Sequence, residues 1–284
     1  MKRLAWLMVA LVVFLALGLI YGEKNHFYRG PLKNNTKTIA PLSALPVPEF
    51  FIVSIIIEMD DKGVAQGSGF VIDRDAGLIA TAKHVIEAGE KEGRVIKVLA
   101  FAEEALSAEE YKTSVAWKHK TADIGVLRIN FGQAKNILSA APLSMTMPPI
   151  GAAVILSGFQ NGLEKKPGTY FYERDGLYLY RREVSLNIHL IDVPMKEISL
   201  TSAVEELELF VELKKKNPAI KYDDVFYRKY LVAKANNEET ICDGLSGSPL
   251  LNSERKAVAV FMGNSNRRFA FTPLEEIPKN FLPR

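Results

Sequence analysis

The sequence predicts an all-β fold built from short strands. Segments rich in β-branched and aromatic residues recur along the chain, and turns rich in glycine and aspartate separate them. Residues 51–59 (FIVSIIIEM) and 64–73 are the first two predicted strands, and the Asp-Asp-Lys-Gly sequence at 60–63 is the turn between them. Many short strands with regularly spaced turns are typical of a barrel or a sandwich and not of an α/β fold.

The rest of the chain continues this pattern, with one exception. Further strands are expected at 78–81, 95–100, 113–118, 124–129, 153–157, 170–172, 177–190, 248–251 and 257–262. The exception is residues 202–216, where a capping-box pattern starts a stretch with apolar residues at helical spacing, and Asn217-Pro218 ends it. We expect an inserted amphipathic helix that packs on the β domain, or, as a weaker alternative, one that controls substrate access.

Composition limits the functional classes. The 284 residues carry a net charge of +3, and the basic residues are spread out, so composition gives no support for nucleic-acid binding. The single cysteine, Cys242, excludes an intramolecular disulfide; we expect a packing residue there, the alternative being a thiol nucleophile. Metal-ligand clusters and phosphate-loop or dinucleotide fingerprints are absent from the sequence, so no metal or cofactor is expected.

The first 22 residues predict a membrane segment. Lys2 and Arg3 precede an uncharged run over 4–21, and eighteen helical residues rise about 27 Å, close to the hydrocarbon thickness of a bilayer. Because the run is long and no A-x-A-like cleavage site follows it, we expect an uncleaved signal anchor with the remainder of the chain on the outer side of the membrane; a cleaved signal peptide is the alternative. Residues 23–50, interrupted by four prolines, are expected to be a tether.

Three short segments carry residues suited to acyl transfer. Residues 81–85 (TAKHV) contain His84, residues 121–127 (TADIGVL) contain Asp123, and residues 244–250 (GLSGSPL) place Ser246 in a glycine-bearing turn. A serine hydroxyl needs a base to take its proton, a histidine titrates near neutral pH, and a carboxylate can fix its tautomer. The glycines allow backbone N–H groups to face an oxyanion. His119, near Asp123, is a rival base.

These segments resemble the trypsin-like serine peptidases, particularly the disulfide-free bacterial HtrA-type branch. TAKHV is similar to the family's T-A-x-H-V, Asp123 and the four residues after it resemble D-[IL]-A-[LV]-L, and GLSGSPL resembles G-[DN]-S-G-G-P-L. The Gly-Ser-Gly-Phe sequence at 67–70 and the segment from 149 to 159 also resemble parts of that family, and the order His, Asp, Ser agrees with it. The resemblance covers 51–277 and is thin between 160 and 240.

The resemblance implies a fold, a chemistry and a site. It implies two packed six-stranded antiparallel β-barrels, one over about 51–145 and one over about 146–284 with an insertion at 160–240, together forming a peptidase domain over 51–284. It puts the general base on His84, the orienting carboxylate on Asp123, the nucleophile on Ser246, and the oxyanion hole on the backbone N–H groups of Gly244 and Ser246. It implies a polypeptide substrate and a bacterial cell envelope location, in the periplasm or outside the cell. The substrate-pocket walls that it implies are Thr240, Ile241, Val260, Phe261 and Met262.

Two positions depart from the family pattern. Leu245 stands where the family has Asp or Asn, so we expect no activation by pairing with a new N-terminus. Ser248 stands where the family has a second glycine, which affects the geometry of the turn. Two other functional classes therefore stay open: a non-catalytic relative that binds extended peptides, and a structural partner in an envelope assembly.

Overall fold

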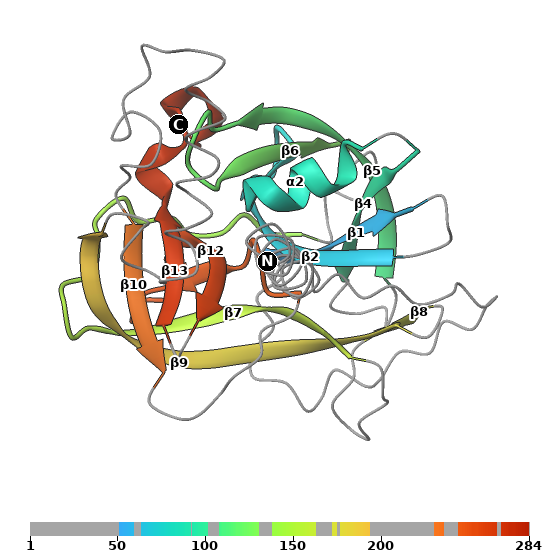
Figure 1. Cartoon of the computed structure of the whole chain (residues 1–284). Coiled ribbons are helices and arrows are strands. Elements are labelled where there is room, and N and C mark those ends of the chain that lie inside the picture. The colour runs from blue at the N-terminus through green and yellow to red at the C-terminus, as the bar shows by residue number, and fades with distance from the viewer. Residues whose placement is uncertain are drawn as a thin grey trace, which may run out of the picture.

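Two packed β-barrels make up the part of the chain that the structure describes (Figure 1). The structure is a computed structural model, and it describes residues 51–59, 64–91, 93–101, 108–130, 138–162, 172–174, 177–193, 230–235, 244–265 and 268–283. Within these ranges no helix combines the length and the apolar character needed to cross a bilayer. The predicted membrane segment, tether and 202–216 helix lie outside the described residues.

Barrel one is a closed six-stranded antiparallel barrel. Its strands are β1 (Ile52–Glu58), β2 (Val64–Asp73), β3 (Leu78–Thr81), β4 (Val95–Phe101), β5 (Ala108–Lys118) and β6 (Gly125–Ile129). They close in the order β1-β2-β3-β6-β5-β4, with β4 pairing back to β1. Each segment predicted as a strand in this half of the chain forms one. The apolar, β-branched strands β1, β2, β3 and β6 bury most of their side chains, whereas β5 is largely exposed or half-buried and is held by its pairing with β4 and β6.

Barrel two is a ring of six strands with a seventh strand added at its edge. Its strands are β7 (Ala153–Gly162), β8 (Tyr172–Arg174), β9 (Leu177–Val193), β10 (Tyr230–Ala235), β11 (Pro249–Leu251), β12 (Ala257–Ser265) and β13 (Arg268–Pro273). Six of them form a ring in the order β10-β13-β12-β11-β7-β9, which the β9–β10 pairing closes, and β8 extends the edge of β9. The expected two six-stranded barrels are therefore confirmed.

Residues 160–240, where we expected an insertion, supply two of the ring strands. β9 is 17 residues long; its first half pairs with β7 and its second half with β10. β10 and β13 are not among the predicted strands, and without them the second ring would stay open. The second ring is thus built from more of this stretch than the sequence indicates.

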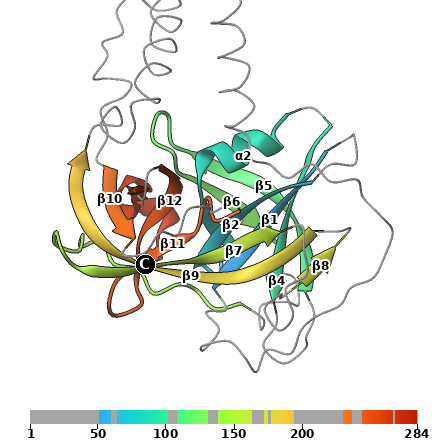
Figure 2. The same cartoon turned by 60° about the horizontal axis from the view of Figure 1, so that its bottom comes forward.

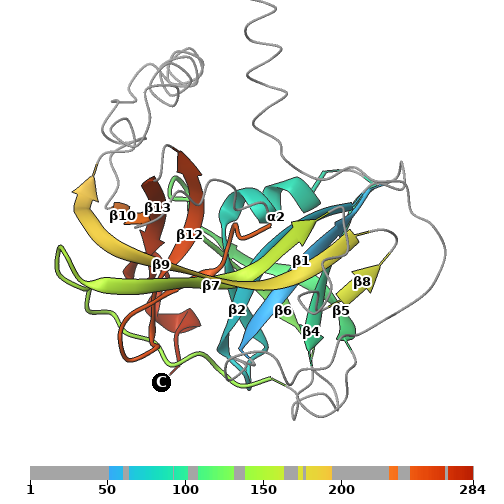
Figure 3. The same ribbon diagram turned by 90° about the horizontal axis from the view of Figure 1, so that it is seen from below.

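A long hairpin joins the two barrels. β7 and β9 run across the molecule from barrel two to barrel one in Figure 3, and β7 packs against β1 and β2. Phe159 of β7 and Leu179 of β9 are buried in the same apolar cluster as the core of barrel one. Burying side chains of this size contributes about 1.5–3 kcal/mol each. The barrels therefore share a core instead of meeting across a polar surface.

One helix and the C-terminal turns lie on the outside of barrel one. Helix α2 (Lys83–Gly89) follows β3 and lies on the outside of barrel one, as Figure 2 shows. After β13 the chain makes two short 3₁₀ turns, η4 (Leu274–Glu276) and η5 (Lys279–Phe281). The Phe281 ring packs on Trp117 of β5 with centroids 6.1 Å apart, so the tail of barrel two reaches back onto barrel one.

Candidate active site

His84 lies in the first turn of α2, directly after a buried strand. β3 ends at Thr81, Ala82 is extended, and the helix begins at Lys83. Val85 and Ile86 point into the core, which leaves the His84 side chain at the surface of barrel one with 40% of its area exposed. The strand-to-helix junction therefore presents an imidazole at a fixed position on the outside of the barrel.

Asp123 binds His84 through both of its carboxylate oxygens. Asp123 precedes β6 by two residues. Its Oδ2 accepts from His84 Nδ1 at 2.7 Å, and its Oδ1 accepts from the His84 backbone N–H at 2.9 Å. A ring that donates from Nδ1 to a carboxylate keeps Nε2 free of its proton in the neutral form. The geometry therefore fixes the tautomer that a general base requires.

The two groups shift each other's pKa in opposite directions. For His84, burial lowers the pKa, but the charge of Asp123, its hydrogen bond and the more distant Glu87 outweigh burial, so the pKa lies above the ordinary 6.5. For Asp123, burial raises the pKa, and the charge and hydrogen bonds of His84, together with Lys83, outweigh it, so the pKa lies below 3.8. Both shifts favour an imidazolium–carboxylate pair, which is the state that forms when the base takes a proton.

Ser246 stands in a tight turn between two glycines with left-handed backbones. Gly244 has φ +84° and Gly247 has φ +91°, values that L side chains rarely adopt. The turn is closed by the Ser248 N–H, which donates to the Leu245 carbonyl at 2.9 Å, and the Gly247 N–H donates to the Phe261 carbonyl at 2.8 Å. The turn is thus tied to β12 directly after the nucleophile position.

The turn packs against the segment that carries His84. A Cβ on Gly247 would lie 2.0 Å from the Ser68 carbonyl oxygen, 2.3 Å from Thr81 Oγ1 and 3.1 Å from the Ala82 nitrogen. The Ser68 N–H also donates to the Ser246 carbonyl at 2.8 Å. The structure therefore brings the Ser246 turn onto the end of β3, where the chain enters the helix that bears His84.

The Ser246 side chain makes its hydrogen bond within barrel two. Its hydroxyl donates to the Met262 carbonyl at 3.4 Å, a long contact on the neighbouring strand β12. Rotation about one side-chain bond redirects the Oγ atom without moving the turn. The Ser246 hydroxyl thus makes one long hydrogen bond, whereas the backbone of its turn is fixed by several short ones.

His119 has a different role from His84. Its Nδ1 accepts from the backbone N–H groups of Thr121 and Ala122 at 3.1 and 2.7 Å, and its Nε2 pairs with Glu276 Oε2 at 3.2 Å. Both ring nitrogens are therefore engaged in supporting the loop that leads to Asp123. This arrangement makes His119 a structural residue and not the base.

The predicted pocket walls fall into three groups. Val260 and Phe261 are fully buried; Phe261 packs on Phe269 and Phe271 with ring centroids 5.9 and 5.3 Å apart, in the core of barrel two. Met262 is partly exposed and offers its carbonyl to Ser246. Thr240 and Ile241, like Cys242, lie outside the described residues. The Val260 and Phe261 side chains are therefore closed to solvent, and Met262 is the described pocket residue that is partly exposed.

The two departures from the family pattern are accommodated inside barrel two. Leu245 and Ser248 are both 0% exposed, and Leu245 belongs to the apolar core of barrel two. A Cβ on Gly158 of β7 would lie 1.8 Å from Ser248 Oγ, so the missing side chain at 158 provides the space that the Ser248 hydroxyl fills. The turn therefore forms with serine at 248, with its hydroxyl unpaired among the described residues.

Sequence reasoning missed the polar residues of β2. Gln66 and Ser68 are buried at 4% and 0% exposure, and their side chains reach carbonyls of barrel two. The available signal was the presence of hydrogen-bonding side chains inside otherwise apolar strands, because a buried polar group needs a partner. The identity of that partner, far away in sequence, was not readable.

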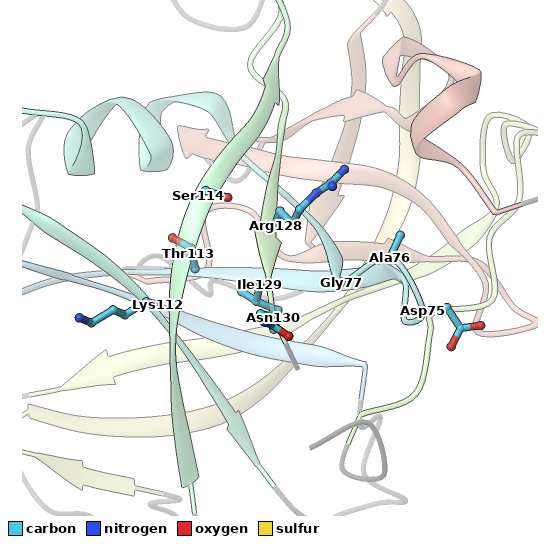
Figure 4. A pocket seen from close by; sticks show the side chains of 9 residues that line it. All are labelled: Asp75, Ala76, Gly77, Lys112, Thr113, Ser114, Arg128, Ile129 and Asn130. Carbon is cyan, nitrogen blue, oxygen red and sulfur yellow. The ribbon is translucent and has the colours of Figure 1, made fainter. Parts of the chain in front are cut away.

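A pocket in the described region lies apart from this site. It has a volume of about 530 Å³ and is lined by residues 75–77, 112–114 and 128–130 of barrel one. Figure 4 shows the Lys112 and Arg128 side chains pointing away from each other, so they do not converge on a common ligand. Among the described residues, no three His, Cys, Asp or Glu side chains gather where they could hold a metal ion.

A known protein family matches part of this chain. Residues 67–203 match the trypsin-like peptidase domain family, a range that includes His84 and Asp123 and ends before Ser246. The chain carries a trypsin-like peptidase domain. The family resemblance carried by the sequence motifs is thereby confirmed.

Solved structures of other proteins share the fold of this peptidase domain. The structure of Deg5 is 16% identical over 80% of this chain and 85% of that one, with a TM-score of 0.53. The active form of the Rv3671c protease from M. tuberculosis is 15% identical over 84% of this chain and 90% of that one, with a TM-score of 0.52. A search of curated protein sequences returned no match. At these identities the structural likeness speaks for the fold alone.

Proposed function

We propose that this trypsin-like peptidase is an active serine endopeptidase in which His84, Asp123 and Ser246 form the catalytic triad. The observation that carries the proposal is the pair of hydrogen bonds, 2.7 and 2.9 Å, from His84 to the two oxygens of Asp123, beside a turn that holds Ser246 against the same segment. A histidine oriented in this way by a carboxylate is poised to accept a proton from a serine.

The chemistry follows from the positions of these groups. Ser246 Oγ turns from the Met262 carbonyl toward His84, which takes its proton as the oxygen attacks a peptide carbonyl. The backbone N–H groups of Gly244 and Ser246 stabilise the oxyanion. His84 then protonates the leaving amine, and water releases the acyl-enzyme by the same steps in reverse order. The raised pKa of His84 favours the imidazolium that appears in both steps.

The substrate binds as an extended strand in this proposal. β12 pairs with β11 through Pro249 and Val260, and the Phe261 main chain bonds to Gly247 and Ser248. Beyond Phe261 the pairing of β12 continues on the β13 side only, among the described residues. An edge of this kind offers main-chain groups to an extended peptide. We propose a preference for small or medium apolar side chains before the cut bond, for which the partly exposed Met262 is the remaining described pocket residue. A peptide-library profile dominated by Arg or Lys would contradict it.

The proposed location is the outer side of the cytoplasmic membrane of a bacterium. The proposal rests on the uncharged run at 4–21 behind Lys2 and Arg3. Fractionation of cells that express the full chain, before and after a carbonate wash and protease treatment of spheroplasts, tests it. Recovery of the full-length chain in the soluble cytoplasmic fraction would contradict it.

Probe labelling tests the enzymatic activity directly. A fluorophosphonate, which reacts with activated serines, is expected to label the wild type and not Ser246→Ala. Ser253→Ala is the matched control, because Ser253 is an exposed serine in the turn after β11. Labelling that persists in Ser246→Ala, or that is absent from the wild type, would contradict the proposal.

A second candidate function is a non-catalytic module that binds extended peptides. The observation that favours it is the Ser246 hydroxyl bonded to the Met262 carbonyl at 3.4 Å. This candidate predicts that the wild type captures peptides without cleaving them, and that Ser246→Ala captures them equally well. Cleavage by the wild type would rule it out.

A further inference from the structure

Ser68 lies between the two halves of the candidate site. Its N–H donates to the Ser246 carbonyl at 2.8 Å, and its carbonyl accepts from Thr81 Oγ1 at 2.7 Å. Its hydroxyl donates to the Gly244 carbonyl at 2.9 Å and accepts from the Phe159 N–H at 3.0 Å. One fully buried residue of barrel one is therefore bonded to the turn on both sides of Leu245.

Gln66 adds a second donor to the same carbonyl. Its Nε2 lies 3.3 Å from the Gly244 oxygen, 3.2 Å from the Phe159 oxygen and 2.7 Å from the Gly67 oxygen. Gln66 Oε1 lies against the Gly244 α-carbon, where a Cβ would come within 1.7 Å of it. The Gly244 carbonyl thus accepts from the Ser68 hydroxyl at 2.9 Å and lies within reach of Gln66 Nε2, whose two hydrogens it shares with the other acceptors, while Gln66 Oε1 contacts its α-carbon.

The hydrogen bonds to the Gly244 carbonyl restrict the orientation of the Gly244 N–H, which is the proposed oxyanion donor. The N–H and the carbonyl of one residue are linked through only two rotatable bonds. Glycine at φ +84° has wide conformational freedom, and the hydrogen bonds to its carbonyl hold the peptide plane on one side of the α-carbon, which restricts the positions open to the N–H on the other side. Buried hydrogen bonds of this kind are costly to break, because the partner is left without water.

The need for such a grip follows from Leu245. An acidic residue at that position could be tied down by a positively charged N-terminus, whereas Leu245 is a fully buried apolar side chain. The turn must then be held by neutral groups already in place. Ser68 and Gln66 are neutral, buried and in contact with the turn.

We infer that Ser68 and Gln66 are positioning residues that hold the Gly244 peptide in its oxyanion-binding orientation. They take the place of a charge-based activation step and keep the site preformed. This inference rests on the proposed function, because the oxyanion is that of the proposed acyl transfer. It assigns to two strand residues of barrel one an effect on chemistry performed by a turn of barrel two.

The test compares Ser68→Ala with two other variants of the full chain. Ser68→Thr keeps the hydroxyl. Ser54→Ala is the matched control, since Ser54 is the direct cross-strand neighbour of Ser68 and is equally buried. The Ser54 hydroxyl donates to the Gly67 carbonyl at 3.5 Å and accepts from Gln66 Nε2 at 3.2 Å, so both of these bonds stay within barrel one. Peptide turnover gives kcat and KM, a peptide boronic acid reports affinity for a transition-state-like adduct, and thermal unfolding shows whether each variant is folded at the assay temperature.

The expected result separates positioning from general stability. Loss of one oxyanion donor costs about 10²–10³ in kcat, so a donor that is only misplaced in Ser68→Ala should cost about 10- to 100-fold, with KM within about twofold. Boronate affinity falls in parallel, Ser68→Thr recovers most of the loss, and Ser54→Ala stays near wild type. A Ser68→Ala enzyme with kcat and boronate affinity equal to those of Ser54→Ala overturns the inference.

Hydrogen exchange tests the same inference without activity. Amides of the 244–248 turn are expected to exchange faster in Ser68→Ala than in wild type, and to be unchanged in Ser54→Ala. If wild type neither turns over peptide nor reacts with the fluorophosphonate, the proposed function fails while this measurement still decides whether the grip exists. If these amides exchange in Ser68→Ala at the wild-type rate, Ser68 does not hold the turn and the inference is overturned.

Discussion

Replacing Asp123 by asparagine tests the central pair of the site. In the wild type Asp123 accepts two hydrogen bonds from His84, one from the ring and one from the backbone. An asparagine has one acceptor oxygen and one NH₂ group, so it cannot accept both, and an NH₂ group facing Nδ1 favours the tautomer with the proton on Nε2. That tautomer cannot take a proton from Ser246.

The size of the effect follows from the role of the pair. Loss of the correct tautomer in a triad lowers kcat by about 10⁴, or about 5 kcal/mol in the activation barrier. The pH profile of kcat/KM should also move. In the wild type Asp123 outweighs burial and raises the pKa of His84 above 6.5, so the acid limb lies above pH 6.5. In Asp123→Asn burial remains without the carboxylate, so the limb moves toward lower pH.

The assay is steady-state peptide cleavage from pH 5 to 9, with Asp73→Asn as the control. Asp73 also accepts a backbone N–H through its carboxylate, from Ala76 at 2.9 Å, in an exposed turn. This control should keep wild-type activity and an unchanged acid limb. An Asp123→Asn enzyme with the activity and the limb of the wild type would refute the reasoning.

Three further predictions follow from the same geometry. Gly247→Ala should lower the free energy of unfolding, measured by urea titration, by about 2 kcal/mol or more and should abolish probe labelling, because φ is +91° and a Cβ would clash with Ser68 and Thr81. The control Gly263→Ala, whose Cβ would lie in open space, should have neither effect. Gly158→Ala should destabilise the fold because its Cβ would clash with the Ser248 hydroxyl, and the double variant with Ser248→Gly should recover part of the lost free energy of unfolding. A double variant whose loss equals the sum of the two single losses would contradict this prediction. Because folding lowers the pKa of Asp123, the ionised carboxylate stabilises the fold above its unfolded pKa, and this stabilisation is lost as pH falls through the folded pKa. Asp123→Asn should therefore reduce the loss of stability at acid pH, and a pH dependence of the urea midpoint equal to that of the wild type would contradict this prediction.

The sequence was sufficient for barrel one and for two thirds of barrel two. Strands such as β1 are runs of β-branched residues between clear turns, and this signal needs no partner to be read. β10 (YLVAKA) and β13 (RFAFTP) were missed because short mixed segments become strands only through pairing with each other and with β9. Helix α2 was missed as well, because it is seven residues long and Ala82 gives it no side-chain cap.

The candidate site was predictable where a residue type has few alternatives. A histidine, an aspartate and a serine in their motif contexts located the groups that bear the chemistry, and the structure pairs His84 with Asp123. Gln66 and Ser68 were not predictable, because their partner Gly244 is 178 and 176 residues away. Contacts at that separation depend on how the two barrels dock, which no local pattern encodes.

The β7–β9 hairpin has a consequence for any attempt to divide the molecule. Phe159 and Leu179 belong to the second barrel by chain order and to the core of the first by location. A fragment ending near residue 145 would lack Phe159 and Leu179 and would expose the part of its core that they cover. The complementary fragment would expose these two apolar side chains to water. We expect the halves to aggregate when expressed alone and to become soluble only when produced together, so the smallest unit that can be purified is the pair.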